Sequence, residues 1–223
     1  ASVVAIDQGF GVQLDGRSVK TPSKKMLIVP TQAMAQAVAA EWDAQTGLIR
    51  PDLMLMTRYA NSAIEKVAPQ FHAVADHLAT YGETDLLCYR ATAPQELIDR
   101  QAAAWDAWLE WSAQEFRAPL TATSGVMYIA QPAPSLANLR AQMNAMTAYH
   151  LSAFHDLVAI SGSLILALAL AKGRINADQA YVLSRIDEQW QIEQWGQDEE
   201  ASALDASKRR AMQEAWAFFQ MSA

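Results

Sequence analysis

The sequence predicts an α+β fold, in which a small N-terminal domain of antiparallel strands and helices precedes an all-helical C-terminal domain, an orthogonal helix bundle. Short β-prone runs separated by turn signals fill the first thirty residues. After Pro94, apolar residues recur almost throughout at helical spacing. The 223 residues suffice for one large domain or two small ones. We therefore expect domains at residues 1–93 and 94–223.

The N-terminal strands follow from a hairpin signal. Asp15 and Gly16 stand between the β-prone runs Phe10–Leu14 and Arg17–Thr21, and Asp-Gly favours a two-residue turn between paired strands. Residues Met26–Val29 are expected to form a third strand, and Thr84–Arg90 a later one.

The first helix is expected to start at Thr31, whose hydroxyl can cap it, and to end before Gly47. Met34, Val38 and Trp42 fall on one face at helical spacing, so Trp42 is assigned a structural role in the core. Two more helices are expected, at residues 57–67 and 69–81.

The second half is predicted to contain one long helix after Pro94 and a short strand at Val126–Ile129. Helices follow between residues 135 and 172, with breaks near His150 and Gly162. Asn176 and Gln179 have capping-box spacing at the start of a helix that should run to Trp195 and end at Gly196. A last helix is expected from Asp198 to about Gln220.

Composition excludes some classes of function. Charged residues make up 18% of the chain, below the usual quarter, so exposed apolar patches are expected. The net charge is −7, and six acids lie between residues 187 and 200, so there is no basic face for nucleic acid. The apolar run Leu157–Ala171 is too short to span a membrane and is expected to be a buried helix.

No constellation for catalysis is present in the sequence. It lacks a phosphate-binding glycine loop and a His-Glu-x-x-His motif, and its histidines are spaced by five residues, which splays them on a helix. The single cysteine, Cys88, lies in an apolar run and is expected to be buried and inert. We expect no enzyme activity, no metal and no cofactor.

The stretch Ser184–Ala201 combines six acids with two tryptophans. On a helical wheel, Leu183, Ile186 and Trp190 form one apolar stripe, which we assign a structural role. The nearly opposite face holds Glu188 among three apolar residues: Tyr181, Ile192 and Trp195.

Two interpretations of this second face remain open. The last helix could fold over it, with Glu188 paired to Arg209 or Arg210. Alternatively, the face could bind a protein, because aromatic residues are enriched in interfaces and a carboxylate there selects a partner of opposite charge. In the second case Asp187, Glu188, Ile192 and Trp195 would form the partner-binding set.

Six segments in order resemble the family of assembly chaperones that handle the alpha subunit of F-type ATP synthase in mitochondria and alpha-proteobacteria. The resemblance covers about residues 10–201, through VQLDGRSVKTP, EWDAQ, MTRYANSAIEKV, ETDLLCYRA, SLILALAL and DEQWQIEQWGQDEEA. It implies a chaperone without catalytic activity, and it attaches importance to Asp187, Glu188 and Trp42.

The resemblance also implies the partner, the unassembled alpha subunit, which the chaperone keeps from aggregating before the catalytic hexamer forms. A free monomer in the bacterial cytoplasm is expected; the alternative location is the mitochondrial matrix. An adaptor for another client, or a small enzyme with a non-standard site, is the alternative function.

Overall fold

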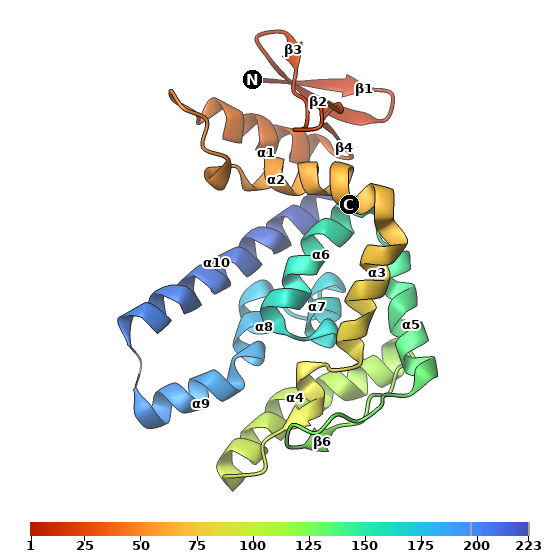
Figure 1. Cartoon of the computed structure of the whole chain (residues 1–223), viewed down its shortest axis with the longest axis vertical. Helices are drawn as coiled ribbons and strands as arrows, with labels where there is room; N and C mark the ends of the chain where they lie inside the picture. Colours follow the sequence, from red (N-terminus) through yellow and green to blue (C-terminus); the bar gives the residue numbers. More distant parts are fainter. Residues whose placement is uncertain (197, 223) are drawn as a thin grey trace. The chain divides into compact units, whose positions relative to one another are not determined.

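The computed structural model describes residues 1–196 and 198–222, most of which are helical (Figure 1). The chain forms two compact units. The first comprises the described residues of 1–74, 146–154 and 214–223, and the second those of 75–145 and 155–213. Strands and helices come first along the chain and an almost wholly helical part follows, so the predicted α+β class is confirmed. The division at residues 93 and 94 stays a prediction.

A small antiparallel sheet organises the first unit. Strand β2 (Gly9–Leu14) pairs with β1 (Ser2–Ile6), β3 (Arg17–Ser18) and β4 (Ile28–Val29). The hairpin signal is confirmed, since Asp15 and Gly16 both have positive φ angles, as a tight turn between β2 and β3 requires. Strand β1 was not predicted.

Glycine is required where β2 meets β4. A Cβ atom on Gly9 would lie 2.4 Å from the carbonyl oxygen of Val29, and the φ angle of Gly9 is +139°. Any other residue would push these two strands apart.

Helix α1 (Gln32–Asp43) packs on this sheet, as Figure 1 shows. It begins as predicted, because the Thr31 hydroxyl accepts a hydrogen bond of 3.2 Å from the backbone N–H of Met34. Met34 and Val38 are fully buried and fix the face that α1 turns to the sheet.

The two helices expected next form one nearly continuous run. Helix α2 (Leu55–Ser62) continues through a π turn at Ala63–Val67 and a 3-10 turn at Ala68–Gln70 into α3 (Phe71–Ala79). Pro69 lacks a backbone N–H, so the regular α-helical hydrogen bonding cannot pass through this point unchanged.

The second unit is built around α7 (Leu164–Ala171), in which every residue from Leu164 to Leu170 is buried. The run Leu157–Ala171, expected to be a buried helix, is divided at Gly162 and Ser163, and the expectation is confirmed for its second part, α7. Within the part of the chain that the structure describes, no helix is both long and apolar enough to cross a bilayer. Helices α4 (Gln95–Glu115) and α8 (Ala177–Ser184) pack against α7, and α9 (Ile186–Trp195) packs against α4.

The remaining helices complete the two units. Helix α5 (Ala133–Asn144) belongs to the second unit, whereas α6 (Ala148–Ser161) and α10 (Glu199–Met221) contribute residues to both. The breaks between α5, α6 and α7 fall near the two expected positions. A short parallel pair, β5 (Tyr89–Arg90) and β6 (Thr123–Ser124), joins two loops of the second unit.

The strand expected at Thr84–Arg90 is wrong for most of its length. The Asp85 carboxylate accepts a hydrogen bond of 3.0 Å from the N–H of Leu87 and starts a 3-10 turn, so only Tyr89 and Arg90 are extended. The strand expected at Val126–Ile129 is also wrong, because β6 ends at Ser124 and Gly125 turns the chain with a φ of +85°.

The helix expected from Ala177 to Trp195 is two helices. Arg185 has φ −115° and ψ 21°, which separates α8 from α9. The capping box at Asn176 and the end at Gly196 are nevertheless confirmed at the outer limits of the pair.

Candidate functional site

Helix α9 is held against α4 by two polar contacts. The amide of Gln101 donates a hydrogen bond of 2.6 Å to the Asp187 carboxylate. The Arg100 guanidinium makes two bonds to the Glu193 carboxylate, at 2.7 and 2.9 Å. Together with the burial of Ile186, they determine which side of α9 faces α4.

The orientation of Gln101 is itself determined. This side chain is only 1% exposed, and its amide oxygen accepts a hydrogen bond of 2.8 Å from the N–H of Ala91. Its NH₂ group must therefore face Asp187 as a donor. Asp187, which we predicted to bind a partner, uses one carboxylate oxygen to accept this hydrogen bond from Gln101 within the second unit.

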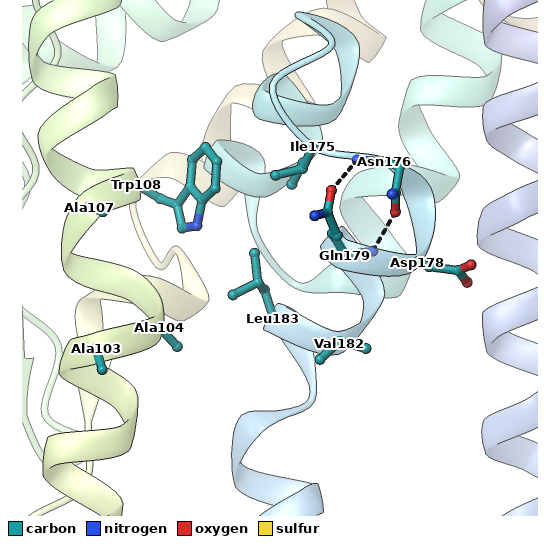
Figure 2. A pocket seen from close by; sticks show the side chains of 10 residues that line it. All are labelled: Ala103, Ala104, Ala107, Trp108, Ile175, Asn176, Asp178, Gln179, Val182 and Leu183. Atoms are coloured by element: carbon teal, nitrogen blue, oxygen red, sulfur yellow. Dashed lines mark hydrogen bonds between the residues drawn. The ribbon is translucent and has the colours of Figure 1, made fainter.

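Helix α8 is fixed at both ends. Asn176 and Gln179 form the capping box at its start (Figure 2). At its end, the indole N–H of the fully buried Trp105 donates 2.8 Å to the carbonyl of Leu183. This bond satisfies a carbonyl that the end of a helix leaves free. The side chain of Leu183 itself is only half-buried.

Arg185, between the two helices, forms an ion pair with Glu188 and another of 3.3 Å with Asp205 of α10. The Tyr181 hydroxyl also donates to Asp205, at 2.7 Å. We considered that the last helix could fold over the second apolar face, and α10 does contact Tyr181 of that face. The same interpretation paired Glu188 with Arg209 or Arg210, whereas in the structure Glu188 pairs with Arg185 and Arg209 pairs with Asp178.

Two residues of the predicted partner-binding set remain open to solvent beside Glu188. Trp195 is 79% exposed and Ile192 is half-buried, while the Glu188 side chain is 42% exposed. Positions 188, 192 and 195 share one face of α9. We call these three residues the α9 face. Trp190, assigned a structural role, is half-buried.

A groove of about 520 Å³ lies between α4 and α8. Helix α4 lines it with Trp108 and with small side chains: Ala103, Ala104 and Ala107. The opposite wall holds Ile175, Val182 and Leu183. In Figure 2, Trp108 and Leu183 project into the space from opposite sides, whereas Asp178 points away from α4.

Negative charge is concentrated on the same helices. Residues 95–115 and 177–195 carry nine acids and two bases, a net charge of −7. The rest of the chain has fifteen of each, so the net charge of the protein resides in α4, α8 and α9. The cluster of six acids between residues 187 and 200 was expected from the sequence, whereas the contribution of α4 to the negative charge was not.

Trp42 and its neighbour Glu41 lie in the first unit. Trp42 is half-buried on α1, close in sequence to the buried Val38. The Glu41 carboxylate accepts three hydrogen bonds of 2.6 to 2.8 Å from the first turn of α2, from the N–H groups of Met56 and Thr57 and from the Thr57 hydroxyl. Glu41 therefore caps α2 and joins two of the segments on which the resemblance depends.

A buried carboxylate plays the same role in the second unit. Asp85 is fully buried and accepts bonds of 2.8 Å from the Ser163 hydroxyl and 3.0 Å from the N–H of Ile165, at the start of α7. Burial raises the pKa of Asp85 to about 6, although the hydrogen bonds oppose this shift. The Ser-Gly-Ser segment thus serves as a helix cap.

The other reactive groups are dispersed or shielded. Cys88 is buried, as expected, and burial raises the pKa of its thiol to about 12. The rings of His77 and His155 stack at a centroid distance of 6.5 Å. Across residues 1–196 and 198–222, no group of three or more metal-binding side chains comes together.

Known proteins resemble this chain along its whole length. Residues 1–113 match the family described as ATP12 chaperone protein. The crystal structure of Atp12 from Paracoccus denitrificans is 49% identical, covers all of this chain and 95% of its own, and superposes with a TM-score of 0.96. A chaperone candidate from Agrobacterium tumefaciens is 36% identical, covers 99% of this chain and 83% of its own, and has a TM-score of 0.93.

A curated relative is more distant in sequence. The mitochondrial protein atp12 of Schizosaccharomyces pombe is 26% identical over 208 residues, which cover 87% of this chain and 71% of the relative. The similar proteins thus come from bacteria and from a mitochondrion.

Proposed function

We propose that this chain, which belongs to the ATP12 chaperone family, binds the unassembled alpha subunit of F-type ATP synthase and prevents its aggregation before the catalytic hexamer forms. Family membership is the observation that carries the proposal, because the sequence and the fold agree with Atp12 along the whole chain. The role requires a binding surface and needs neither cofactor nor metal.

The α9 face is the surface we assign to the client. A tryptophan that is 79% exposed is unusual in a free protein, and tryptophans are enriched at the energetic centres of interfaces. Glu188 lies one helical turn from Ile192, so an approaching client would meet a carboxylate beside apolar surface. Asp187 would act from behind, by holding α9 on α4 through Gln101.

The free chaperone is proposed to be a monomer of the bacterial cytoplasm. Its identity to the Paracoccus protein, 49%, is well above its identity to the mitochondrial relative, 26%. A processed mitochondrial protein is the alternative.

Co-expression tests this function. The alpha subunit of ATP synthase, produced alone and together with this chain, is assayed for soluble yield and for a complex in gel filtration, and the beta subunit of the same enzyme serves as the control client. We expect a one-to-one complex with alpha alone, and a higher soluble yield of alpha. A complex with neither subunit, or an equal effect on both, would contradict the assignment of the client.

A further inference from the structure

The groove between α4 and α8 is distinct from the α9 face and has no assigned role. Seven of its ten lining residues are apolar, and the three polar ones form hydrogen bonds within the protein. Asn176 and Gln179 bond to each other, and Asp178 accepts bonds from Arg209 and Gln213. An occupant therefore meets a mainly apolar surface and must contribute apolar side chains.

The shape of the groove suits one face of a helix. Three alanines on one wall let another backbone approach closely, and Trp108 closes one side. Its volume of about 520 Å³ is within the range of specific binding pockets. Val182, in the opposite wall, is 55% exposed although it is β-branched and apolar. Grooves between helices commonly receive the apolar stripe of an amphipathic helix.

The charge around the groove determines which charged side chains can lie beside the apolar stripe of that helix. At 100° per residue, Glu96 and Glu110 of α4 point to the same side of the helix as Ala103 and Ala107. Neither carboxylate forms an ion pair within the part of the chain that the structure describes. The net charge of −7 on α4, α8 and α9 is partly offset by ion pairs that Arg90, Arg174 and Arg209 make with three of the acids. The surroundings of the groove remain negative, so basic side chains beside it would be attracted and acidic ones repelled.

We propose that the groove between α4 and α8 binds an amphipathic helix with Lys or Arg residues flanking its apolar stripe. The helix belongs to the unassembled client, and this part of the proposal rests on the proposed chaperone function. An anionic lipid surface does not fit, because the acids of α4 would face its headgroups. A second copy docked groove to groove does not fit either, since it would bring the same net charge of −7 to the same place.

A synthetic helical peptide of Leu and Lys, labelled with a fluorophore, serves as the probe, and its binding is followed by fluorescence anisotropy. The control peptide has Glu in place of each Lys. Ala107→Trp fills the groove at an exposed alanine, and Ala206→Trp is the matched control at an exposed alanine of α10 outside the groove. Circular dichroism establishes that both variants are folded.

We expect Ala107→Trp to weaken binding of the Leu/Lys peptide by at least about tenfold, whereas Ala206→Trp leaves it unchanged. The Leu/Glu peptide should bind at least about tenfold more weakly to the native chain, and salt should weaken Leu/Lys binding. Equal binding by Ala107→Trp and native chain, or equal binding of the two peptides, would overturn the proposal. Self-association of the native chain that Ala107→Trp abolishes would also overturn it, in favour of a second copy.

Binding of the alpha subunit distinguishes a failure of the proposed function from a failure of the groove assignment. If the native chain binds the Leu/Lys peptide in the groove but binds no alpha subunit, the proposed function fails and the groove assignment stands. If the alpha subunit binds native chain and Ala107→Trp equally well, the function stands and the client does not use the groove.

Discussion

Gln101 donates its amide N–H to the carboxylate of Asp187 across 2.6 Å, and this bond joins α4 to α9 through two residues that are 86 positions apart in the sequence. It separates the roles of two adjacent acids. Asp187 faces α4, whereas Glu188 faces outward and pairs with Arg185. Asp187 and Glu188 are adjacent acids in the sequence, but Asp187 has a structural role and Glu188 lies at the surface.

This division predicts unequal effects of two alanine substitutions. Asp187→Ala leaves the buried NH₂ group of Gln101 without its acceptor and should lower the free energy of unfolding by about 1–3 kcal/mol. Glu188→Ala breaks a partly exposed ion pair and should lower it by less than about 1 kcal/mol. Urea denaturation of both variants measures the difference. Equal losses would mean that the Gln101 bond does not hold α9.

The cap that Glu41 places on α2 predicts a second stability effect. Glu41→Ala removes the acceptor of three hydrogen bonds in the first turn of α2 and should lower the free energy of unfolding by about 2 kcal/mol. Asp43→Ala is the control, two residues away in the same helix, and it breaks an exposed ion pair with the N-terminal ammonium that should contribute less than about 1 kcal/mol. The account of this cap is wrong if thermal and urea unfolding do not distinguish the two variants.

Asp85 predicts a pH dependence with a definite sign. Because the folded pKa, about 6, lies above the usual value of 3.8, the folded chain holds this proton more tightly than the unfolded chain. The resulting stabilisation is complete below about pH 4 and is lost as the pH rises through about 6, by at most about 3 kcal/mol. The free energy of unfolding, measured by urea denaturation across this range, should therefore contain a decline attributable to Asp85.

The variant Asp85→Asn isolates that contribution. Its amide does not titrate, so the decline between about pH 4 and pH 6 should become smaller than in the native chain. The variant is also expected to be less stable throughout, since an NH₂ group cannot accept the bond from Ile165. The prediction concerns how steeply the free energy of unfolding declines with pH. If this decline is the same in Asp85→Asn as in the native chain, the pH dependence is due to other groups.

Burial ranks the residues assigned structural roles on α8 and α9. Ile186 is buried, and Ile186→Ala should lower the free energy of unfolding by about 2–4 kcal/mol. Leu183 is half-buried beside the groove, so Leu183→Ala should lower it by less, about 1–2 kcal/mol. Calorimetric melting of the two variants gives the comparison, and the reverse order would contradict the assigned packing.

Local signals in the sequence predicted local structure well. Thr31, Asn176 and the Asp15-Gly16 turn act within a few residues of their own positions, so a pattern in one segment was enough to place them. The same holds for α7, whose continuous apolar run is typical of a buried helix.

The incorrect predictions concern segments whose structure depends on hydrogen bonds to residues that are distant in the sequence. Asp85 folds Thr84–Arg90 into a turn while it caps α7, about 80 residues later. Trp105 bonds to the carbonyl of Leu183, at the point where the predicted single helix divides. The groove likewise needs α4 beside α8, and no spacing within either segment indicates that arrangement.

The central claim is that the α9 face holds the client, and one affinity measurement tests it most directly. Binding of the alpha subunit is compared for the native chain, Glu188→Lys and Glu115→Lys, a control reversal that breaks the exposed pair with Arg174. Both variants should remain folded, because each breaks one partly exposed ion pair, and such a pair usually contributes less than about 1 kcal/mol. The account predicts that Glu188→Lys weakens binding at least about tenfold, through a repulsive charge in the contact, and that Glu115→Lys does not. Equal affinity of the two folded variants would place the client elsewhere on the molecule.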